Sequence, residues 1–197
     1  MIDIKTSVIR GAEVSELGKF AHDRTKYLNA SEAGNCIRKD WYSKHLTEAA
    51  EPQMWGYARR GIHGEKYIID SLKLANVPLL VGDASVQFSL QDEKRIGLEI
   101  KTIDPRTNRS YLPKPAHVTQ LQICMAMINE QKKPAGMKFS RGLLVYMDAS
   151  NYDDISQHIV DMDEGILDRM AKRAKKVLNT VDVAGLDREG KRNGGKE

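Results

Sequence analysis

The sequence predicts a mixed α/β domain in which helices flank a small central β-sheet. Apolar residues recur with a helical period over three segments, residues 52–75, 115–130 and 164–178. Shorter apolar runs typical of strands lie at residues 86–90, 95–102, 142–148 and 155–162. Because helices precede, separate and follow these strands, we expect the helices to pack on one sheet that the strands form together.

Length and composition are those of one globular domain. The chain has 197 residues, of which 41% are hydrophobic and 29% charged, and this composition excludes global disorder. No apolar stretch approaches the length of a membrane span, and residues 1–14 lack the apolar core of a secretory signal. With only Cys36 and Cys124, a disulfide framework is not expected. We therefore expect a cytoplasmic protein with no membrane partner, in the host cytoplasm if a phage encodes it.

Charge is distributed unevenly along the chain. The net charge is +4, yet residues 148–168 contain seven acidic side chains and no Lys or Arg. Residues 1–147 carry +6 and residues 169–197 carry +5. The body of the chain is therefore mildly basic, which suits a polyanionic partner. We predict a flexible N-terminus over residues 1–12, one domain over 13–180, and a disordered tail over 181–197.

Each predicted helix has a local signal. Residues 13–28 are expected to form the first helix, and Ser31 followed by Glu32 indicates the start of the next, although the spacing of a capping box is not met. The helix over 52–75 has His63 at the edge of an apolar stripe formed by Trp55, Ala58, Ile62, Ile69 and Leu72. One face of the helix that starts at Pro115 carries His117, Gln120, Leu121, Cys124 and Ile128. The inward face of the last helix carries Ile166, Leu167, Met170, Ala174 and Val177.

The segment GLEIKT, residues 97–102, is unusual for a buried strand. Because strand side chains alternate between faces, Glu99 and Lys101 share one face and Ile100 points to the other. Asp83 lies sixteen residues before Glu99, ahead of the strand that should pair with GLEIKT. Two carboxylates and a lysine suit phosphodiester hydrolysis. Mg²⁺ prefers carboxylate oxygens and lowers the pKa of a bound water, and a lysine can orient that water.

The position of Asp83 depends on the register of the hairpin. A two-residue turn at residues 92–93 would place Glu99 opposite Val86 and turn Asp83 toward the other face. A three-residue loop, or one bulge near residues 82–85, would return Asp83 to the face of Glu99. We therefore predict an odd-length loop or such a bulge.

Five segments, taken in order, resemble motifs of the PD-(D/E)XK nuclease superfamily, in its RecB-like and lambda-exonuclease-like branch. Asp83 followed by Glu99, Ile100 and Lys101 resembles the superfamily signature. ASEAGNCIRKDWY resembles the N-terminal helix motif, RRGIHGEKYI resembles the helix with a metal-binding histidine, and HVTQLQICMAM resembles the glutamine motif. The resemblance spans residues 30–128 and implies a restriction-endonuclease-like core, which GLLVYMD and the final helix would complete.

The resemblance implies a metal-dependent deoxyribonuclease, and specifically an exonuclease of phage or bacterial recombination, repair or genome processing. Lys101 would activate the attacking water, and Gln120 would position a ligand or the nucleophile. Asp83 and Glu99 would complete the catalytic set. The ligands of one or two Mg²⁺ or Mn²⁺ ions would be His63, Asp83, Glu99 and the carbonyl of Ile100.

The resemblance also implies DNA as the partner, with DNA ends or single strands as the expected substrates. Ser31 and Arg38 would hold a phosphate, and His117 would face the DNA or serve a structural role. A ring-shaped homo-oligomer would favour processive digestion, and the branch admits a recombination or annealing protein as a further partner.

Two features depart from the family pattern. Cys124 stands where the glutamine motif often continues with a tyrosine, so the fine substrate contacts stay open. Related nucleases commonly hold an iron–sulfur cluster on four cysteines, and Cys36 matches the first of them. No later trio follows in the sequence, so we expect no cluster. The expected kin are stand-alone, phage-type exonucleases.

Each candidate residue also has an ordinary structural interpretation. Glu99 and Lys101 alone would suit an ion pair on an edge strand, and Asp83 would suit a turn after Gly82. The other candidates also have ordinary structural roles. His63 could be a structural helical histidine and Gln120 a residue of a packed helix face. Ser31 could be a helix cap and Arg38 a solvated charge. Two other functions stay open, a structure-specific or other endonuclease on the same site and an inactive DNA-binding module. The intact set of Asp83, Glu99 and Lys101 disfavours the inactive module.

Overall fold

The computed structural model describes residues 3–16, 24–46, 53–77, 79–81, 87–91, 94–131 and 138–181. Its helices are α1 (Ile4–Glu16), α2 (Ala30–Ala33), α3 (Ile37–His45), α4 (Gln53–Leu74), α5 (Pro115–Glu130) and α6 (Ile166–Asn179), with 3-10 turns η1 (Arg24–Lys26) and η2 (Arg109–Tyr111). Its strands are β1 (Leu79–Val81), β2 (Gln87–Gln91), β3 (Lys94–Ile103), β4 (Arg141–Asp148) and β5 (Ile155–Asp161).

The strands form one mixed sheet in the order β1-β2-β3-β4-β5. β3 is its centre, because it pairs antiparallel with β2 and parallel with β4. A parallel pair needs a long crossover, and α5 supplies it between β3 and β4. The prediction of a mixed α/β domain around a small sheet is therefore confirmed, and the predicted helix over 115–130 matches α5 at both ends.

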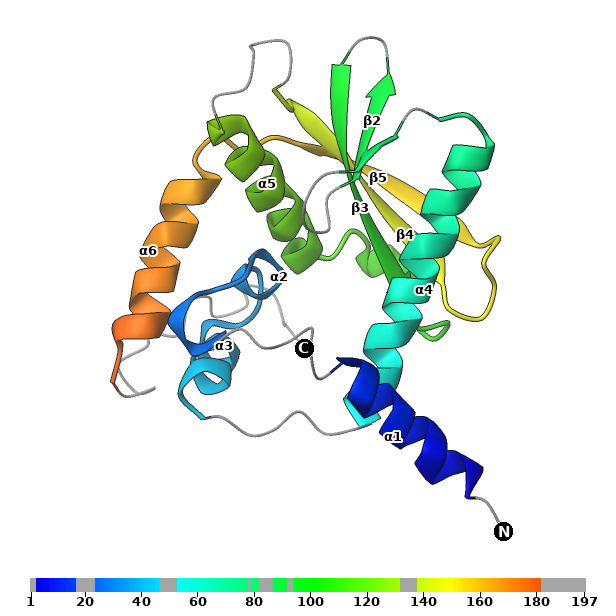
Figure 1. Ribbon diagram of the computed structural model, residues 1–197. Helices are drawn as coiled ribbons and strands as arrows, with labels where there is room; N and C mark the ends of the chain where they lie inside the picture. Colours follow the sequence, from blue (N-terminus) through cyan, green and yellow to red (C-terminus); the bar gives the residue numbers. More distant parts are fainter. Residues whose placement is uncertain are drawn as a thin grey trace, which may run out of the picture.

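Two helices cover opposite faces of the sheet (Figure 1). On the α5 face, Leu121 and Met125 pack against Leu144 and Tyr146 of β4. On the α4 face, the packed residues are Ile68, Leu98, Ile100, Val145 and Met147. The alternation predicted for GLEIKT is therefore confirmed, because Ile100 enters the core on the α4 face while Glu99 points to the α5 face.

Helix α4 comes very close to the sheet at one glycine. A Cβ atom on Gly64 would lie 2.3 Å from Thr102 Oγ1 and 2.7 Å from Met147 Cε. No side chain fits between the helix and the strands at this point. The helical turn that carries His63 is thereby held against β3, immediately beyond Lys101.

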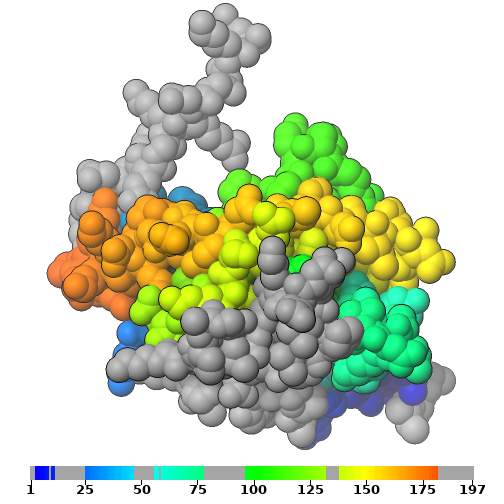
Figure 2. Space-filling view, turned by 90° about the horizontal axis from the view of Figure 1, so that it is seen from above, coloured from blue at the N-terminus to red at the C-terminus, as the bar shows by residue number. Residues whose placement is uncertain are grey.

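Helices α2, α3 and α6 form a second layer on the outer side of α5. Ala33 of α2, Ile166 of α6 and two residues of α5, Ile123 and Ala126, pack together. The segments from β5 to α6 form a continuous yellow-to-orange band in the space-filling view (Figure 2). This layer matters for the site. It packs α2, which carries the predicted phosphate contact Ser31, against α5, which carries Gln120.

The prediction for the first helix is wrong. The first helix spans Ile4–Glu16 rather than 13–28, and residues 24–26 form a 3-10 turn. The Asp3 carboxylate accepts a hydrogen bond from the Thr6 N–H at 3.1 Å, so the helix has a capping side chain near the chain start. The segment expected to be flexible over residues 1–12 is thus helical from Ile4 onward.

The start predicted at Ser31 is nearly right, and its capping group lies two residues earlier. Helix α2 begins at Ala30, and the Asn29 N–H donates to Glu32 Oε2 at 2.9 Å. Asn29 and Glu32 have the spacing of a capping box. The prediction missed it because it placed the helix start at Ser31 instead of Asn29. The predicted tail over 181–197 lies outside the described residues except for Val181.

Within the described ranges, no helix combines the length and the apolar character that crossing a membrane would require.

Candidate functional site

The centre of the candidate site is a buried carboxylate on β3. Glu99 is only 2% exposed. Its Oε1 accepts a hydrogen bond from Gln120 Nε2 at 2.8 Å and lies 2.6 Å from Lys101 Nζ. Three residues of the predicted catalytic set are therefore together, and β3 and the following helix α5 position them.

The local sequence explains why these groups meet. Glu99 and Lys101 are two residues apart on one strand, so both project toward α5. Pro115 starts α5, and the helical period then turns Gln120 inward beside Leu121. Lys101 keeps 24% of its side chain exposed, so the ammonium lies at the border between the buried carboxylate and solvent.

Burial dominates the electrostatics of Glu99. Removal from water raises the pKa of this carboxyl, while the Lys101 ammonium lowers it and the Glu65 carboxylate raises it further. Its second oxygen, Oε2, is buried and has no hydrogen-bond partner among the described residues. A buried carboxylate oxygen in this state is costly unless a cation or another donor meets it.

A histidine and a tyrosine adjoin this centre. Tyr146 on β4 is the register partner of Lys101. Its hydroxyl accepts a hydrogen bond from the Lys114 N–H at 2.9 Å and lies 3.0 Å from His117 Nδ1. Burial, together with the positive charges of Lys101 and Lys114, lowers the pKa of His117 to about 4. The ring is therefore neutral at physiological pH, and the Lys101 charge acts on it.

Tyr146 is the site residue that the sequence analysis missed. The run GLLVYMD was interpreted only as a core strand, and Tyr146 is indeed fully buried. A signal was present in the sequence, since a buried tyrosine hydroxyl needs a polar partner. The identity of that partner depends on the parallel pairing of β3 with β4, which the sequence does not specify.

His63 lies on α4, at the helical turn that passes over β3. Its side chain is exposed, and the next residue, Gly64, contacts Thr102. The charge of Glu65 acts on Glu99, so this turn is within electrostatic reach of the buried carboxylate. No contact joins His63 to Glu99 within the described part of the chain, and the metal-ligand role of His63 stays a prediction.

The predicted odd-length hairpin loop is wrong. Gln91 pairs with Lys94, so the connection has two residues, and Gln87 pairs with Leu98. In this register Gln87 and Ser89 lie opposite Leu98 and Ile96, so apolar alternation across the hairpin does not account for the two-residue connection.

Asp83 and the alternative bulge near residues 82–85 lie outside the described residues. Val81 ends β1 and pairs with Gln87, the first residue of β2. Asp83 follows Val81 by two positions in the sequence, and its own placement is not described. Its role as a ligand stays a prediction.

Ser31 lies near the same helix face as Gln120. A cavity of about 490 Å³ between α2, α5 and α6 is lined by Ser31, Gln120 and Cys124, among others. Arg38 follows on α3, with its Nε atom buried and without a hydrogen-bond partner in the described ranges. The structure therefore brings Ser31 to Gln120, whereas no contact joins Arg38 to either residue within those ranges.

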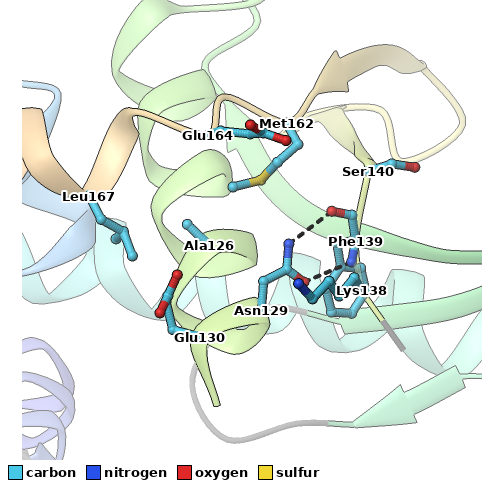
Figure 3. A pocket seen from close by; sticks show the side chains of 9 residues that line it. All are labelled: Ala126, Asn129, Glu130, Lys138, Phe139, Ser140, Met162, Glu164 and Leu167. Atoms are coloured by element: carbon cyan, nitrogen blue, oxygen red, sulfur yellow. Dashed lines mark hydrogen bonds between the residues drawn. The ribbon is translucent and has the colours of Figure 1, made fainter. Parts of the chain in front are cut away.

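A second hollow lies at the other end of α5 (Figure 3). Asn129 donates a hydrogen bond to the Phe139 carbonyl at 2.9 Å and accepts one from the Phe139 N–H at 2.8 Å. These bonds fasten the start of β4 to α5. None of the predicted site residues is among the described residues that line this hollow, so we assign it a structural role.

Cluster and family comparisons add no assignment. Among the described residues, no group of three or more His, Cys, Asp or Glu side chains could hold a metal ion. Cys36 and Cys124 are both free thiols. Neither the protein-family models nor the curated proteins with which the sequence was compared match the chain.

Proposed function

We propose that the protein is a metal-dependent nuclease that hydrolyses phosphodiester bonds in DNA. The observation that carries this proposal is the Glu99 carboxylate. Lys101 and Gln120 fix one of its oxygens, and the other is buried without a partner in the described ranges. A protein that buries a carboxylate in this way without a use for it would lose stability.

The donor set suits Mg²⁺ or Mn²⁺. Glu99 Oε2 supplies a hard oxygen ligand. The turn between Gln91 and Lys94 makes them a hydrogen-bonded pair, so alternation directs the carbonyls of Leu98 and Ile100 toward the β2 side. Among the described residues the β2 ladder ends at Leu98, so no described residue of β2 pairs with Ile100. His63 and Asp83 would add an imidazole and a carboxylate on the strength of the resemblance.

A bound divalent ion would supply a water of lowered pKa and would polarise the phosphoryl group. The protein's own groups define the remaining chemistry. Lys101 reaches from Glu99 toward solvent, so its free N–H donors can orient a water molecule or neutralise charge on the phosphate. Gln120 fixes Glu99 Oε1, which leaves Oε2 directed away from that bond.

DNA would approach along the N-terminal half of α5. The neutral His117 ring lies there, and Ser31 adjoins Gln120 through the shared cavity. The preference for DNA ends, and with it the exonuclease activity, rests on the resemblance of residues 30–128 to the phage-type exonucleases. An endonuclease would use the same groups.

The test is a nuclease assay on linear and closed circular DNA with Mg²⁺, Mn²⁺ or EDTA. We expect linear DNA to be degraded with either metal and to survive in EDTA. Lys101→Ala should lose cleavage by a factor of about 100 or more, because a positioned acid–base group contributes that much. Lys66→Ala is the matched control, since the partner of Lys66 among the described residues is Asp70, on the exposed face of α4.

The outcomes separate the alternatives. No cleavage by the wild-type protein with either metal would refute the nuclease. Cleavage of closed circles would exclude a strict exonuclease and favour the endonuclease. Full activity in Lys101→Ala would refute the assignment of the lysine.

A further inference from the structure

The cavity beside Gln120 has the character of a ligand site. Its volume of about 490 Å³ falls within the range of pockets that hold small organic groups. Three helices form it, and its walls are mainly apolar, with Leu28, Ile123, Met127 and Met170 among the lining residues.

The cavity shares a wall with the proposed catalytic centre. Gln120 lines the cavity and also donates its Nε2 hydrogen bond to Glu99 Oε1 at 2.8 Å. Cys124, one turn further along α5, lines the cavity too, and its thiol is close enough to Glu99 for that charge to raise its pKa. A group inside the cavity would therefore lie one side chain away from Glu99.

The chemistry of the walls selects the occupant. No Asp, Glu, Lys or Arg is among the described lining residues, and burial raises the pKa of the Cys124 thiol to about 11, so that wall is neutral as well. A phosphate would find no positive charge here. A flat ring with apolar faces and polar edges fits better. Tyr27 offers an aromatic face, and Ser31 and Gln120 offer hydrogen-bonding groups.

We propose that this cavity receives one unpaired base of the DNA substrate and thereby positions the neighbouring phosphodiester at Glu99 and Lys101. The proposal rests on the proposed function for the identity of the substrate. Inserting a base into a pocket requires that base to be unstacked, which is easiest at a DNA end or in a single strand. The cavity would thus contribute to a preference for such substrates.

The test is a binding measurement that needs no catalysis. The full chain in EDTA is titrated into fluorescein-labelled, single-stranded oligonucleotides, each with one abasic position at a different distance from the end. We expect an abasic site at one position to raise Kd roughly 10-fold, since stacking contributes about 1–3 kcal/mol per base. Other positions should change Kd by less than about 2-fold.

Matched variants locate the base. Ala174 on α6 lines the cavity, whereas Ala171, three residues earlier, is exposed and does not. Ala174→Leu should fill the space, raise Kd for the intact oligonucleotide roughly 10-fold and abolish the abasic penalty. Ala171→Leu should behave as wild type. Tyr27→Ala, at a residue that is 40% exposed, provides a second variant that does not depend on core packing and should also reduce the penalty.

Equal affinities across the whole abasic series, or an unchanged penalty in both Ala174→Leu and Tyr27→Ala, would overturn the proposal. Absence of DNA binding would overturn it as well. Failure of the nuclease proposal alone would look different, because the abasic penalty would persist in EDTA while no metal supported cleavage.

Discussion

At the scale of single residues, the notable feature is a carboxylate that the fold buries and only half satisfies. Glu99 has one oxygen between Lys101 and Gln120 and another without a partner in the described ranges. A structural ion pair on an edge strand would be exposed and nearly neutral in energy. Burial of this carboxylate costs free energy of folding, and this cost is the reason for proposing a functional role for Glu99.

The cost predicts a pH dependence of stability. Because burial raises the pKa of folded Glu99, the folded state keeps this proton over a pH window in which the unfolded chain has released it. The free energy of unfolding must therefore fall as pH rises from about 4.3, the ordinary glutamate value, through the folded pKa. In Glu99→Gln, this part of the decrease in the free energy of unfolding with rising pH should be absent. Urea unfolding of both proteins in EDTA between pH 4 and 8 measures it, and parallel pH profiles would contradict it.

The Tyr146 hydroxyl gives a second prediction at this scale. Tyr146→Phe would leave the Lys114 N–H and His117 Nδ1 without their partner. We expect a loss of about 1–3 kcal/mol in the free energy of unfolding, together with slower DNA cleavage as the His117 ring loses its orientation.

Tyr152→Phe is the control, because the Tyr152 ring packs at a tilt against the Tyr67 ring and its hydroxyl has no hydrogen bond within the described ranges. This change should stay within about 0.5 kcal/mol. Equal effects of the two substitutions would argue against a specific role of the Tyr146 hydroxyl.

At the scale of the elements, the contact of α4 with the sheet decides where its polar turn lies. Gly64 allows the helix backbone to approach Thr102 and Met147 more closely than any side chain would permit. His63 and Glu65 flank this glycine, so the same contact sets the distance of both residues from the end of β3.

Two glycines on one helix test this contact. Gly64→Ala should lower the free energy of unfolding by about 1–3 kcal/mol, because the new methyl group overlaps Thr102 and Met147. Gly61→Ala adds the same methyl group where nothing lies within 4 Å. It should stabilise the protein by about 0.5–1 kcal/mol through helix propensity. Thermal unfolding distinguishes them, and a shift of the same sign in both variants would refute the close approach.

At the scale of the whole molecule, buried ion pairs connect the second layer of helices. Asp40 of α3 accepts a hydrogen bond from Arg173 Nη2 of α6 at 2.8 Å, and Lys44 Nζ lies 2.8 Å from Glu32 Oε2 of α2. These three helices surround the cavity or support it, so the pairs help to fix its shape.

Removing one partner of the buried pair tests this connection. Arg173→Met would leave the Asp40 carboxylate buried without its guanidinium, and we expect a loss of about 3–5 kcal/mol in the free energy of unfolding. Arg169, also on α6, forms an exposed pair with Asp163, which precedes the helix. Arg169→Met breaks this pair and should cost no more than about 1 kcal/mol. Chemical denaturation measures both, and similar losses would show that burial of the pair has no special weight.

The sequence by itself determined the faces of β3 and α5. The alternation of GLEIKT placed Glu99 and Ile100 on opposite sides of β3, and the period of residues 115–130 placed Gln120 on the buried face of α5. Such patterns are local consequences of strand and helix geometry, and they do not depend on the rest of the chain. The predicted start of the first helix was wrong because Asp3 caps this helix earlier in the chain.

The tertiary structure decided what surrounds those faces. The pairing of Lys101 with Tyr146 and the cavity formed by α2, α5 and α6 join segments distant in sequence. The hairpin register is local, but it differs from the register that the sequence analysis predicted. A sequence pattern fixes which side of an element is buried, but the partner on that side depends on how sheets and helices pack in space. The sequence pattern thus identified a charged face on β3. Only tertiary packing buried the Glu99 carboxylate and left its Oε2 atom without a partner in the described part of the chain.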